Sequence, residues 1–456
     1  MISDIFAKLG TWDISDSQTV LIAALAAMAC SLPGCFLVIR RQSMMGDALS
    51  HTVLPGIVVA FLLAAWNGVS YQSNQALFHA FLFCGALFVG ILSAVLTEWV
   101  RKQGKVEASA ALGVVYTSMF ALGLLLIRAT ADSVHIDPEC VLYGVLESEA
   151  DPFVIFPPAA IINFTTFMVN FALVVLFFKE LRISAFDPAL ATTLGINARW
   201  IHYGLMAVTA ATIVMAFRSV GSILVIAMLI TPAATAYLLT DRLERMLGIS
   251  LAVAAGCALL GHAIALTLPI FILGPLGFAA EGSANTAGSM AIAAGIFFVA
   301  AVFLGPRHGV LMKILVRRRL QAKIASDDIL GTIYRWEEKH VDGPATPISW
   351  ILENAMEVGA TTPARTFRRL VRRGDIVEQS AGFTLTESGL ARAKELIRSH
   401  RLWEAYMAKH FELPDDHLHD MAHHVEHFID PEIRQQLIDE LDQPELDPHG
   451  KQIPPE

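Results

Sequence analysis

Runs of about 20 apolar residues follow one another through the first 305 residues of this 456-residue chain. Wound as an α-helix at about 1.5 Å per residue, such a run covers a hydrocarbon core of about 30 Å. No run of this kind occurs after residue 320. Since 55% of all residues are hydrophobic and 16% are charged, the sequence predicts an all-α polytopic membrane body followed by a tail outside the bilayer.

The apolar runs predict about nine transmembrane helices. Lys and Arg concentrate in every second connection, for example Arg40 and Arg41, and then Arg101, Lys102 and Lys105. Because positively charged loops stay in the cytoplasm, this alternation places the N-terminus outside and the C-terminus in the cytoplasm. The predicted spans are residues 20–39, 47–66, 76–100, 108–127, 158–178, 201–217, 220–240, 247–272 and 285–304.

The tail accounts for all of the chain's net charge of -9. From residue 320 onward, 15 Lys and Arg residues stand against 25 Asp and Glu residues, and nine of the 15 histidines lie there too. The membrane body is therefore close to neutral, and the tail is acidic and rich in metal-ligand side chains.

Two such side chains, Asp47 and His51, stand four positions apart where the second apolar run begins. Residues at this spacing share one face of a helix, so a carboxylate oxygen and an imidazole nitrogen can hold one divalent cation. Ionisable groups inside a membrane are energetically expensive and often mark a transport pathway. The alternative is that Asp47 caps the helix after Gly46, while His51 only hydrogen-bonds inside the bundle.

Three stretches resemble a known family: "RRQSMMGDALSHTVLPGIVVAFLL", "AFDPALATTLGI" (185–196) and "VGSILVIAMLITPAATAYLLTDR" (220–242). They are similar to segments of the permeases of metal-uptake ABC transporters, which import zinc, manganese or iron. The resemblance covers residues 18–305 and implies that Asp47 and His51 lie on the metal path. It also implies a bacterial inner-membrane location and three partners: an ABC ATP-binding subunit, an extracytoplasmic metal-binding protein and a second permease subunit, in a homo- or heterodimer.

Residues 186–195 lie in a connection that the charge pattern places in the cytoplasm. An Asp-Pro pair suits the start of a short helix here, and a glycine suits its end. Without the resemblance, an ordinary loop with one turn of helix is the simpler interpretation. By resemblance, the segment couples the permease to the ATPase through Phe186, Asp187, Ala191 and Gly195.

His262 is the strongest candidate for a further pathway ligand, although a lone intramembrane histidine is more often packed and hydrogen-bonded. Pro232 removes one backbone hydrogen bond from the seventh span and predicts a kink, which suits a gate or plain bundle packing. The chain has no GxxxxGK[ST] phosphate-binding loop. We therefore expect a transport subunit without its own ATPase, and not an enzyme.

The order of elements in the tail predicts a winged helix-turn-helix. Residues 327–340, 347–358 and 362–375 suit three helices, residues 376–386 suit a β-hairpin around Ala381-Gly382, and residues 387–411 suit a long helix. We predict a transmembrane domain at residues 1–319, a winged helix-turn-helix domain at 320–395, and a helical metal-binding and dimerisation domain at 396–456.

A second resemblance lies in the tail: "LTESGLARAKELIRSHRLWEAYM", "HLHDMAHHVEHFIDPE" and "DPHGKQIP" resemble the diphtheria toxin repressor family of metal-responsive regulators. His419, His423, Glu426 and His427 fall on one face of one predicted helix. Imidazole with carboxylate and without thiolate suits Mn(II), Fe(II) or Zn(II). The alternative is a solvated helix that is rich in histidine by chance.

The resemblance implies two sets of metal ligands in the tail. His423 departs from the family, where a cysteine or a glutamate is usual, so the preferred metal stays open. The primary set is Asp328, His423, Glu426 and His427, and the ancillary set is His400, Glu404 and His419.

Arg365, Arg368 and Arg369 lie on the helix that would contact DNA in such a domain. Against this, the tail is acidic, and a domain tethered to a membrane meets DNA rarely. We therefore predict a permease with a cytoplasmic metal-sensing tail, for which a Mn, Fe or Zn ion is both substrate and regulatory ligand. The alternative hypothesis is a membrane-anchored, metal-dependent transcription regulator whose spans only sense or anchor.

Overall fold

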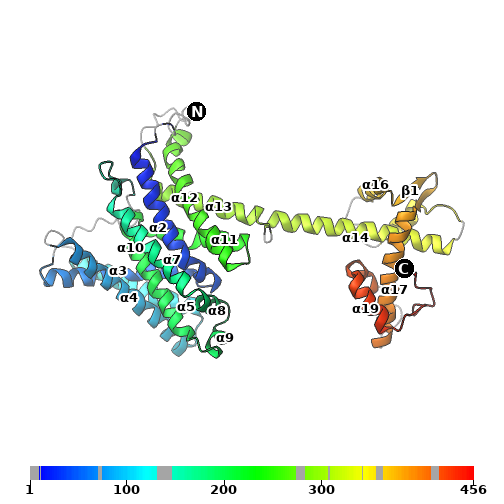
Figure 1. Cartoon of the computed structure of the whole chain (residues 1–456), viewed down its shortest axis with the longest axis horizontal. Coiled ribbons are helices and arrows are strands. Elements are labelled where there is room, and N and C mark those ends of the chain that lie inside the picture. The colour runs from blue at the N-terminus through cyan, green and yellow to red at the C-terminus, as the bar shows by residue number, and fades with distance from the viewer. Residues whose placement is uncertain are drawn as a thin grey trace. The chain divides into compact units, whose positions relative to one another are not determined.

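The computed structural model describes residue 10 and residues 12–69, 74–130, 146–273, 283–306, 309–340, 343–355, 363–411 and 421–455. The chain divides into two compact units, Met1–Met312 and Lys313–Glu456, whose elements are labelled in Figure 1. The first unit is a bundle of long apolar helices, and the second combines shorter helices with one β-hairpin.

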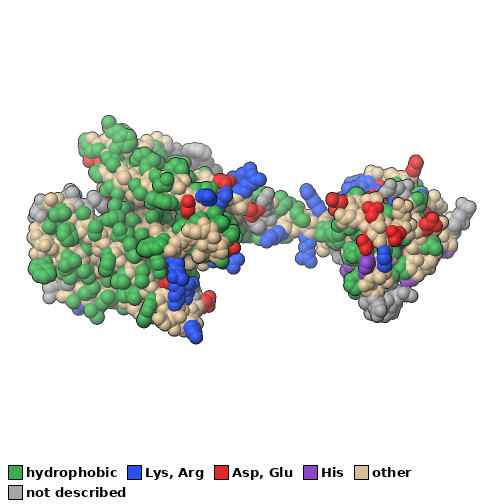
Figure 2. Space-filling model, turned by 60° about the horizontal axis from the view of Figure 1, so that its bottom comes forward, with side chains coloured by type: hydrophobic (Ala, Val, Ile, Leu, Met, Phe, Trp, Pro, Cys, Tyr) green, Lys and Arg blue, Asp and Glu red, His purple; other side chains and the backbone are tan. Residues whose placement is uncertain are grey.

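Eight helices among the described residues are long and apolar enough to cross a membrane. The remaining predicted span forms the apolar helix α11 (Ser222–Leu239), so each predicted span has its helix and the polytopic all-α body is confirmed. Hydrophobic side chains cover much of this unit's surface in Figure 2, as expected where lipid surrounds it. The eight helices are α2 (Ile14–Ile39), α3 (Met44–Trp66), α4 (Gln75–Gly104), α5 (Ala108–Thr130), α7 (Pro158–Leu176), α10 (Ala198–Val220), α12 (Leu243–Leu273) and α13 (Thr286–Leu304).

Glycines let the helices of the bundle approach closely. Helix α2 packs against α11 at Gly34, where a Cβ atom would lie 1.8 Å from the carbonyl oxygen of Leu229. Helices α3 and α4 meet in the same way, since a Cβ at Gly56 or at Gly85 would lie 2.4 or 2.6 Å from the other glycine's carbonyl oxygen. Small residues at such crossings allow the backbone contacts that hold membrane helices together.

The connection between α10 and α11 is a single residue, Gly221, with φ of 77°. Glycine adopts this left-handed conformation without a steric penalty. Helix α11 then continues through Pro232 as one helix.

The second unit has the predicted order of elements. Helix α14 (Val310–Lys339) starts well before residue 327, because residues 310–326 are rich in Leu, Ala, Arg and Lys, which favour helix. Helices α15 (Ile348–Asn354) and α16 (Pro363–Arg373) follow, and then the antiparallel strands β1 (Ile376–Gln379) and β2 (Gly382–Leu385) and the long helix α17 (Glu387–His410). This confirms a winged helix-turn-helix followed by a helical segment.

The hairpin turns one position earlier than predicted. Gln379 pairs with Gly382, so Ser380 and Ala381 form the loop and Gly382 is the first residue of β2. Gly382 cannot be replaced freely, since a Cβ here would lie 2.0 Å from the carbonyl oxygen of Thr346.

Two hydrophobic clusters lie entirely inside the second unit. In the first, Ile329 and Ile333 of α14 pack with Phe367 and Phe383, whose rings stack 4.7 Å apart. The second joins α17 to α19 (Pro431–Glu440) through Leu402, Ile429, Leu437 and Ile438. The unit therefore carries a core of its own.

Candidate functional sites

Asp47 and His51 lie together on one face of α3, as predicted. His51 Nε2 is 3.6 Å from Asp47 Oδ1, and the His51 ring packs against Tyr116 and Phe120 of α5 at 5.8 and 5.2 Å. The helix begins at Met44, so Asp47 lies inside its first turn and not at the N-cap position of the alternative interpretation. The two side chains remain 44% and 31% exposed in the single chain, an unusual state for ionisable groups in an apolar helix.

His262 lies on α12, apart from the Asp47–His51 pair on α3. Its ring is buried, with Nε2 3.1 Å from Asp16 Oδ1 of α2 and Nδ1 3.1 Å from Thr286 Oγ1 of α13. Trp12 packs edge-on against the same ring at 5.2 Å. These contacts join α2, α12 and α13, and none of the described contacts of His262 involves Asp47 or His51.

Residues 186–195 form the expected short helix. It is α9 (Pro188–Thr193), which follows α8 (Phe178–Phe186). Asp187 is its N-cap and accepts hydrogen bonds from the backbone N–H groups of Ala189 and Leu190 at 2.9 and 3.0 Å. Gly195 ends the segment with φ of 81°. Ala191 is buried, whereas Phe186, Leu190 and Leu194 are exposed, so the segment carries an exposed apolar surface.

In the second unit, four predicted ligands from separate parts of the chain come together. Asp328 comes from α14, whereas His423, Glu426 and His427 come from residues 421–428, where α-helix changes to the 3₁₀-helix η4 (Glu426–Phe428). One ligand atom from each of the four lies within 4.8 Å of all the others, and all four residues are buried. We call this group the tail cluster.

The geometry of the tail cluster fits a cation. His427 Nε2 lies 3.1 Å and His423 Nε2 lies 3.7 Å from Asp328 Oδ1, yet neither ring nitrogen makes a hydrogen bond among the described residues. Buried polar atoms that converge without hydrogen bonds are rare in native proteins and indicate a missing ion or water. Carboxylate and imidazole together suit Mn(II), Fe(II) and Zn(II).

In the tail cluster, neighbouring histidines and carboxylates shift each other's pKa values. Burial by itself would lower the pKa of His427, but the neighbouring carboxylates of Asp327 and Asp328 raise that pKa to about 9. Burial would raise the pKa of Glu426, but hydrogen bonds from His400 and His423 lower it to about 2. In the absence of a metal, His427 therefore binds a proton more tightly than a free histidine does, and the protonated ring holds the neighbouring carboxylates together.

Two members of the predicted ancillary set adjoin the tail cluster. His400 of α17 lies between two carboxylates, with Nε2 2.9 Å from Glu404 Oε1 and Nδ1 2.6 Å from Glu426 Oε2. Glu426 thus belongs to both groups. The third member, His419, lies outside the described residues.

Asp327 and His449 lie beside these ligands and were not predicted from the sequence. Asp327 Oδ2 lies 3.7 Å from His427 Nδ1, and His449 Nε2 lies 4.0 Å from Glu404 Oε1. The adjacent pair Asp327-Asp328 was a signal for the first. Nothing in the local sequence distinguishes His449 from the other histidines of the tail.

Arg365, Arg368 and Arg369 are exposed on α16, on the opposite side from the buried Phe367 and Leu370. They form a basic surface of the winged helix-turn-helix, which suits phosphate or carboxylate groups of a partner.

The membrane body matches a known family model. Residues 17–276 match the model of the ABC 3 transport family, which is more than half of the chain. The chain belongs to the ABC 3 transport family. Residues 386–455 of this permease match the iron dependent repressor, metal binding and dimerisation domain, in agreement with the resemblance in the tail.

Individual transport proteins are also similar to this chain. The chain is 35% identical over 383 residues to the zinc transport system membrane protein TroD of Treponema pallidum, covering 83% of this chain and 97% of the relative. It is 35% identical over 317 residues to the manganese transport system membrane protein MntD of Bacillus subtilis, covering 68% and 99%. Among solved structures, PsaBC from Streptococcus pneumoniae in complex with Fab matches at 29% identity with a TM-score of 0.50, covering 68% of this chain and 98% of that chain.

Proposed function

We propose that the chain is the permease subunit of an ABC importer for a divalent transition metal ion, Mn(II), Zn(II) or Fe(II), and that its tail senses such an ion. The observation that carries this proposal is the Asp47–His51 pair in an apolar helix of an ABC 3 family chain. The names of the relatives, zinc and manganese transport systems, support the class of ion.

Asp47 and His51 would offer a carboxylate oxygen and an imidazole nitrogen to a passing ion. Both side chains are partly exposed in the single chain, and lipid is a poor environment for them. This supports a second permease subunit, a copy or a homologue, that covers the pair and completes an aqueous path. We leave His262 outside the path, because its ring is occupied by Asp16 and Thr286.

A separate ATP-binding subunit would act through α8 and α9. The exposed apolar side chains Phe186, Leu190 and Leu194 supply a docking surface, and the buried Ala191 ties α9 to the bundle. This assignment places α9 and the tail in the cytoplasm and the N-terminus outside, in a bacterial inner membrane, as the charge pattern also predicts. An extracytoplasmic binding protein would then deliver the ion on the opposite side.

The tail would hold a regulatory metal ion with Asp328, His423, Glu426 and His427. His400, Glu404 and His419 would form the ancillary set. When bound, the ion supplies a positive charge that replaces the proton on His427 and cross-links α14 to residues 421–428. Since no thiolate is present in the set, the donors favour harder ions than a cysteine-containing site would.

The transport role is tested by metal uptake into vesicles that contain the chain and its ATP-binding subunit. Asp47→Asn and His51→Ala each remove one proposed ligand, so we expect ATP-dependent uptake to fall at least about tenfold, the effect of roughly 1.4 kcal/mol in ion binding. Glu107→Gln, which neutralises an exposed carboxylate just before α5, is the matched control and keeps wild-type uptake. Normal uptake by Asp47→Asn with normal membrane insertion would remove the assignment.

A second candidate function, metal-dependent DNA binding by the tail, is favoured by the exposed arginines of α16. A gel-shift experiment with residues 313–456, with and without Mn(II), separates the two. Sequence-specific, Mn(II)-dependent retardation that Arg368→Gln abolishes would support the regulator, and its absence supports a tail that acts on transport alone.

A further inference from the structure

A cavity of about 420 Å³ lies beside α9, among the ends of α2, α4, α8 and α10. Four arginines line it, but only one carboxylate, Glu98, does. Glu98 is already paired with Arg101 at 2.7 Å and with Lys102 at 3.0 Å. Among the described residues, the other three arginines have no carboxylate within 4 Å. We call this space the arginine cavity; its arginines are Arg40, Arg41, Arg101 and Arg199.

Arg40 is turned inward and is partly buried. Its Nη2 donates a hydrogen bond to Ser184 Oγ at 2.6 Å, and its Nη1 lies 3.4 Å from His202 Nδ1, so neither partner is acidic. Its Nε is buried and makes no hydrogen bond among the described residues. A guanidinium is always charged, and holding it away from water without an opposing charge is costly. A basic residue that only sets topology needs no such burial, so this arrangement indicates an anionic ligand.

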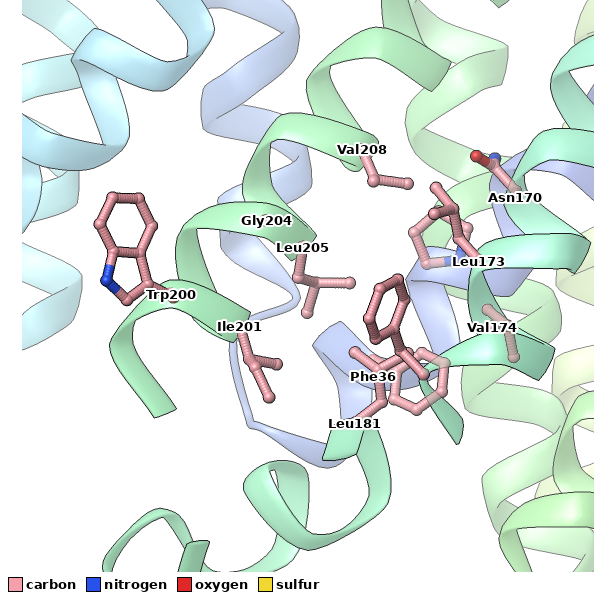
Figure 3. A pocket seen from close by; sticks show the side chains of 12 residues that line it. Phe36, Asn170, Leu173, Val174, Leu181, Trp200, Ile201, Gly204, Leu205 and Val208 are labelled. Atoms are coloured by element: carbon pink, nitrogen blue, oxygen red, sulfur yellow. The ribbon is translucent and has the colours of Figure 1, made fainter. Parts of the chain in front are cut away.

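An apolar groove of about 280 Å³ is lined by α2, α7, α8 and α10, and three of these helices, α2, α8 and α10, also line the arginine cavity. Figure 3 shows Leu205 and Val208 of α10 facing Phe36 of α2 and Leu173 of α7. Asn170 carries the amide side chain in the lining of the groove, and this amide already donates hydrogen bonds to the Ala29 carbonyl oxygen and to Thr212 Oγ1. The groove therefore suits a hydrocarbon chain.

The groove and the arginine cavity follow each other along two helices. On α2, Phe36 lines the groove, and Arg40, one turn later, lines the cavity. On α8, Leu181 and Ser184 have the same relation. Residues three or four apart share a face of a helix, so the apolar groove continues into the arginine cavity. A phospholipid joins an acyl chain to a phosphate in this order, whereas a soluble phosphate would use the cavity alone.

We propose that the groove and the arginine cavity together bind one anionic phospholipid, with its phosphate at Arg40 and Arg199 and an acyl chain between Phe36 and Leu205. This inference goes beyond the proposed function and does not depend on which ion is transported. Phe186 and Pro188 line the same cavity. Bound lipid therefore holds the start of α9 against α2 and α10, and links the proposed coupling segment to membrane composition.

The headgroup part is tested with the purified full chain in a neutral detergent, titrated with phosphatidylglycerol, phosphatidylcholine or inorganic phosphate while thermal unfolding is followed. We expect phosphatidylglycerol to raise the unfolding temperature and phosphatidylcholine to do so much less. Arg40→Gln, and Arg199→Gln at an exposed position, should weaken binding of phosphatidylglycerol at least about tenfold, because each removes a charged hydrogen-bond donor. The exposed Arg245, on α12 and outside the cavity, gives the matched control Arg245→Gln, which binds normally.

The acyl-chain part is tested with Gly204→Phe. Gly204 lines the groove, and a Cβ there meets no atom within 4 Å, so the phenyl ring enters the groove without a clash at its base. We expect this variant to lose phosphatidylglycerol binding, while Gly295→Phe, at another open glycine outside the groove, retains it. The proposal is overturned if both lipids stabilise the chain equally, if the arginine variants bind like Arg245→Gln, or if inorganic phosphate alone binds and Gly204→Phe changes nothing.

Discussion

His427 of the tail cluster should stabilise the metal-free second unit in a pH-dependent way. Its ring is 2% exposed, and Nε2 lies 3.1 Å from Asp328 Oδ1. The pKa of His427 is raised from 6.5 to about 9, because the carboxylates of Asp327 and Asp328 outweigh the opposing effect of burial. A raised folded-state pKa means that the folded state binds the proton more tightly than the unfolded state does.

The shift of about 2.5 pKa units corresponds to about 3 kcal/mol at 1.36 kcal/mol per unit. A cavity of about 160 Å³ reaches His427, so water screens part of this interaction and we expect ~2 kcal/mol. The contribution is complete below pH 6.5 and is lost as the pH rises through about 9. His427→Gln should therefore lower the free energy of unfolding by ~2 kcal/mol at pH 6 and by little above pH 9.5.

The measurement is urea unfolding of residues 313–456 in a chelator at several pH values, since this unit has its own hydrophobic clusters. His424→Gln is the control, because His424 is an exposed histidine three residues away. Mn(II) or Zn(II) at 100 times its Kd should add about 2.7 kcal/mol to the free energy of unfolding of the wild type. The metal should stabilise His427→Gln by less, because this variant lacks one ligand. A pH-independent difference between the variants, or an equal gain from metal, would refute the charge and ligand assignments.

Two further predictions concern single residues, the exposed Leu190 and the tightly packed Gly382. Leu190→Glu places a charge on the exposed apolar side of α9, so we expect ATP-driven uptake in reconstituted vesicles to fall at least about tenfold. The control Thr192→Glu, at an exposed position about half a turn around the helix, should reduce uptake less. If both variants transport normally, α9 is not the docking surface. Gly382→Val places a side chain against the Thr346 carbonyl oxygen, so the free energy of unfolding of residues 313–456 in urea should fall by at least ~2 kcal/mol. Ala381→Val, in the exposed hairpin loop, should lower it little. Equal stability of these two variants would contradict the close approach seen at Gly382.

The apolar runs predicted the spans of the membrane body to within several residues. The fifth predicted span, 158–178, is α7 (Pro158–Leu176). The first helix starts earlier than its apolar run, at Ile14, because Asp13 and Asp16 form a capping box that stabilises an additional polar turn. Hydropathy does not register such a turn, since capping depends on hydrogen bonds and not on transfer to lipid.

Sequence spacing and the resemblance in the tail together predicted four residues that the structure brings within one small volume, Asp328, His423, Glu426 and His427. Local spacing alone could not do this, because Asp328 is about a hundred residues away from the others and its approach depends on the packing of α14. The same limit explains why the contact of His262 with Asp16, 246 positions away, was not predicted.

The sequence by itself determined that this chain is a multi-span helical membrane body with an acidic winged-helix tail. Burial of an apolar run in lipid and pairing of a short hairpin are decided by neighbouring residues, so composition and spacing are sufficient for them. Only the tertiary structure decided which polar groups from distant segments meet: Arg40 with Ser184 and His202 beside an apolar groove, and His400 with Glu426. Such meetings depend on how helices distant in sequence pack against one another, which no local pattern of residues encodes.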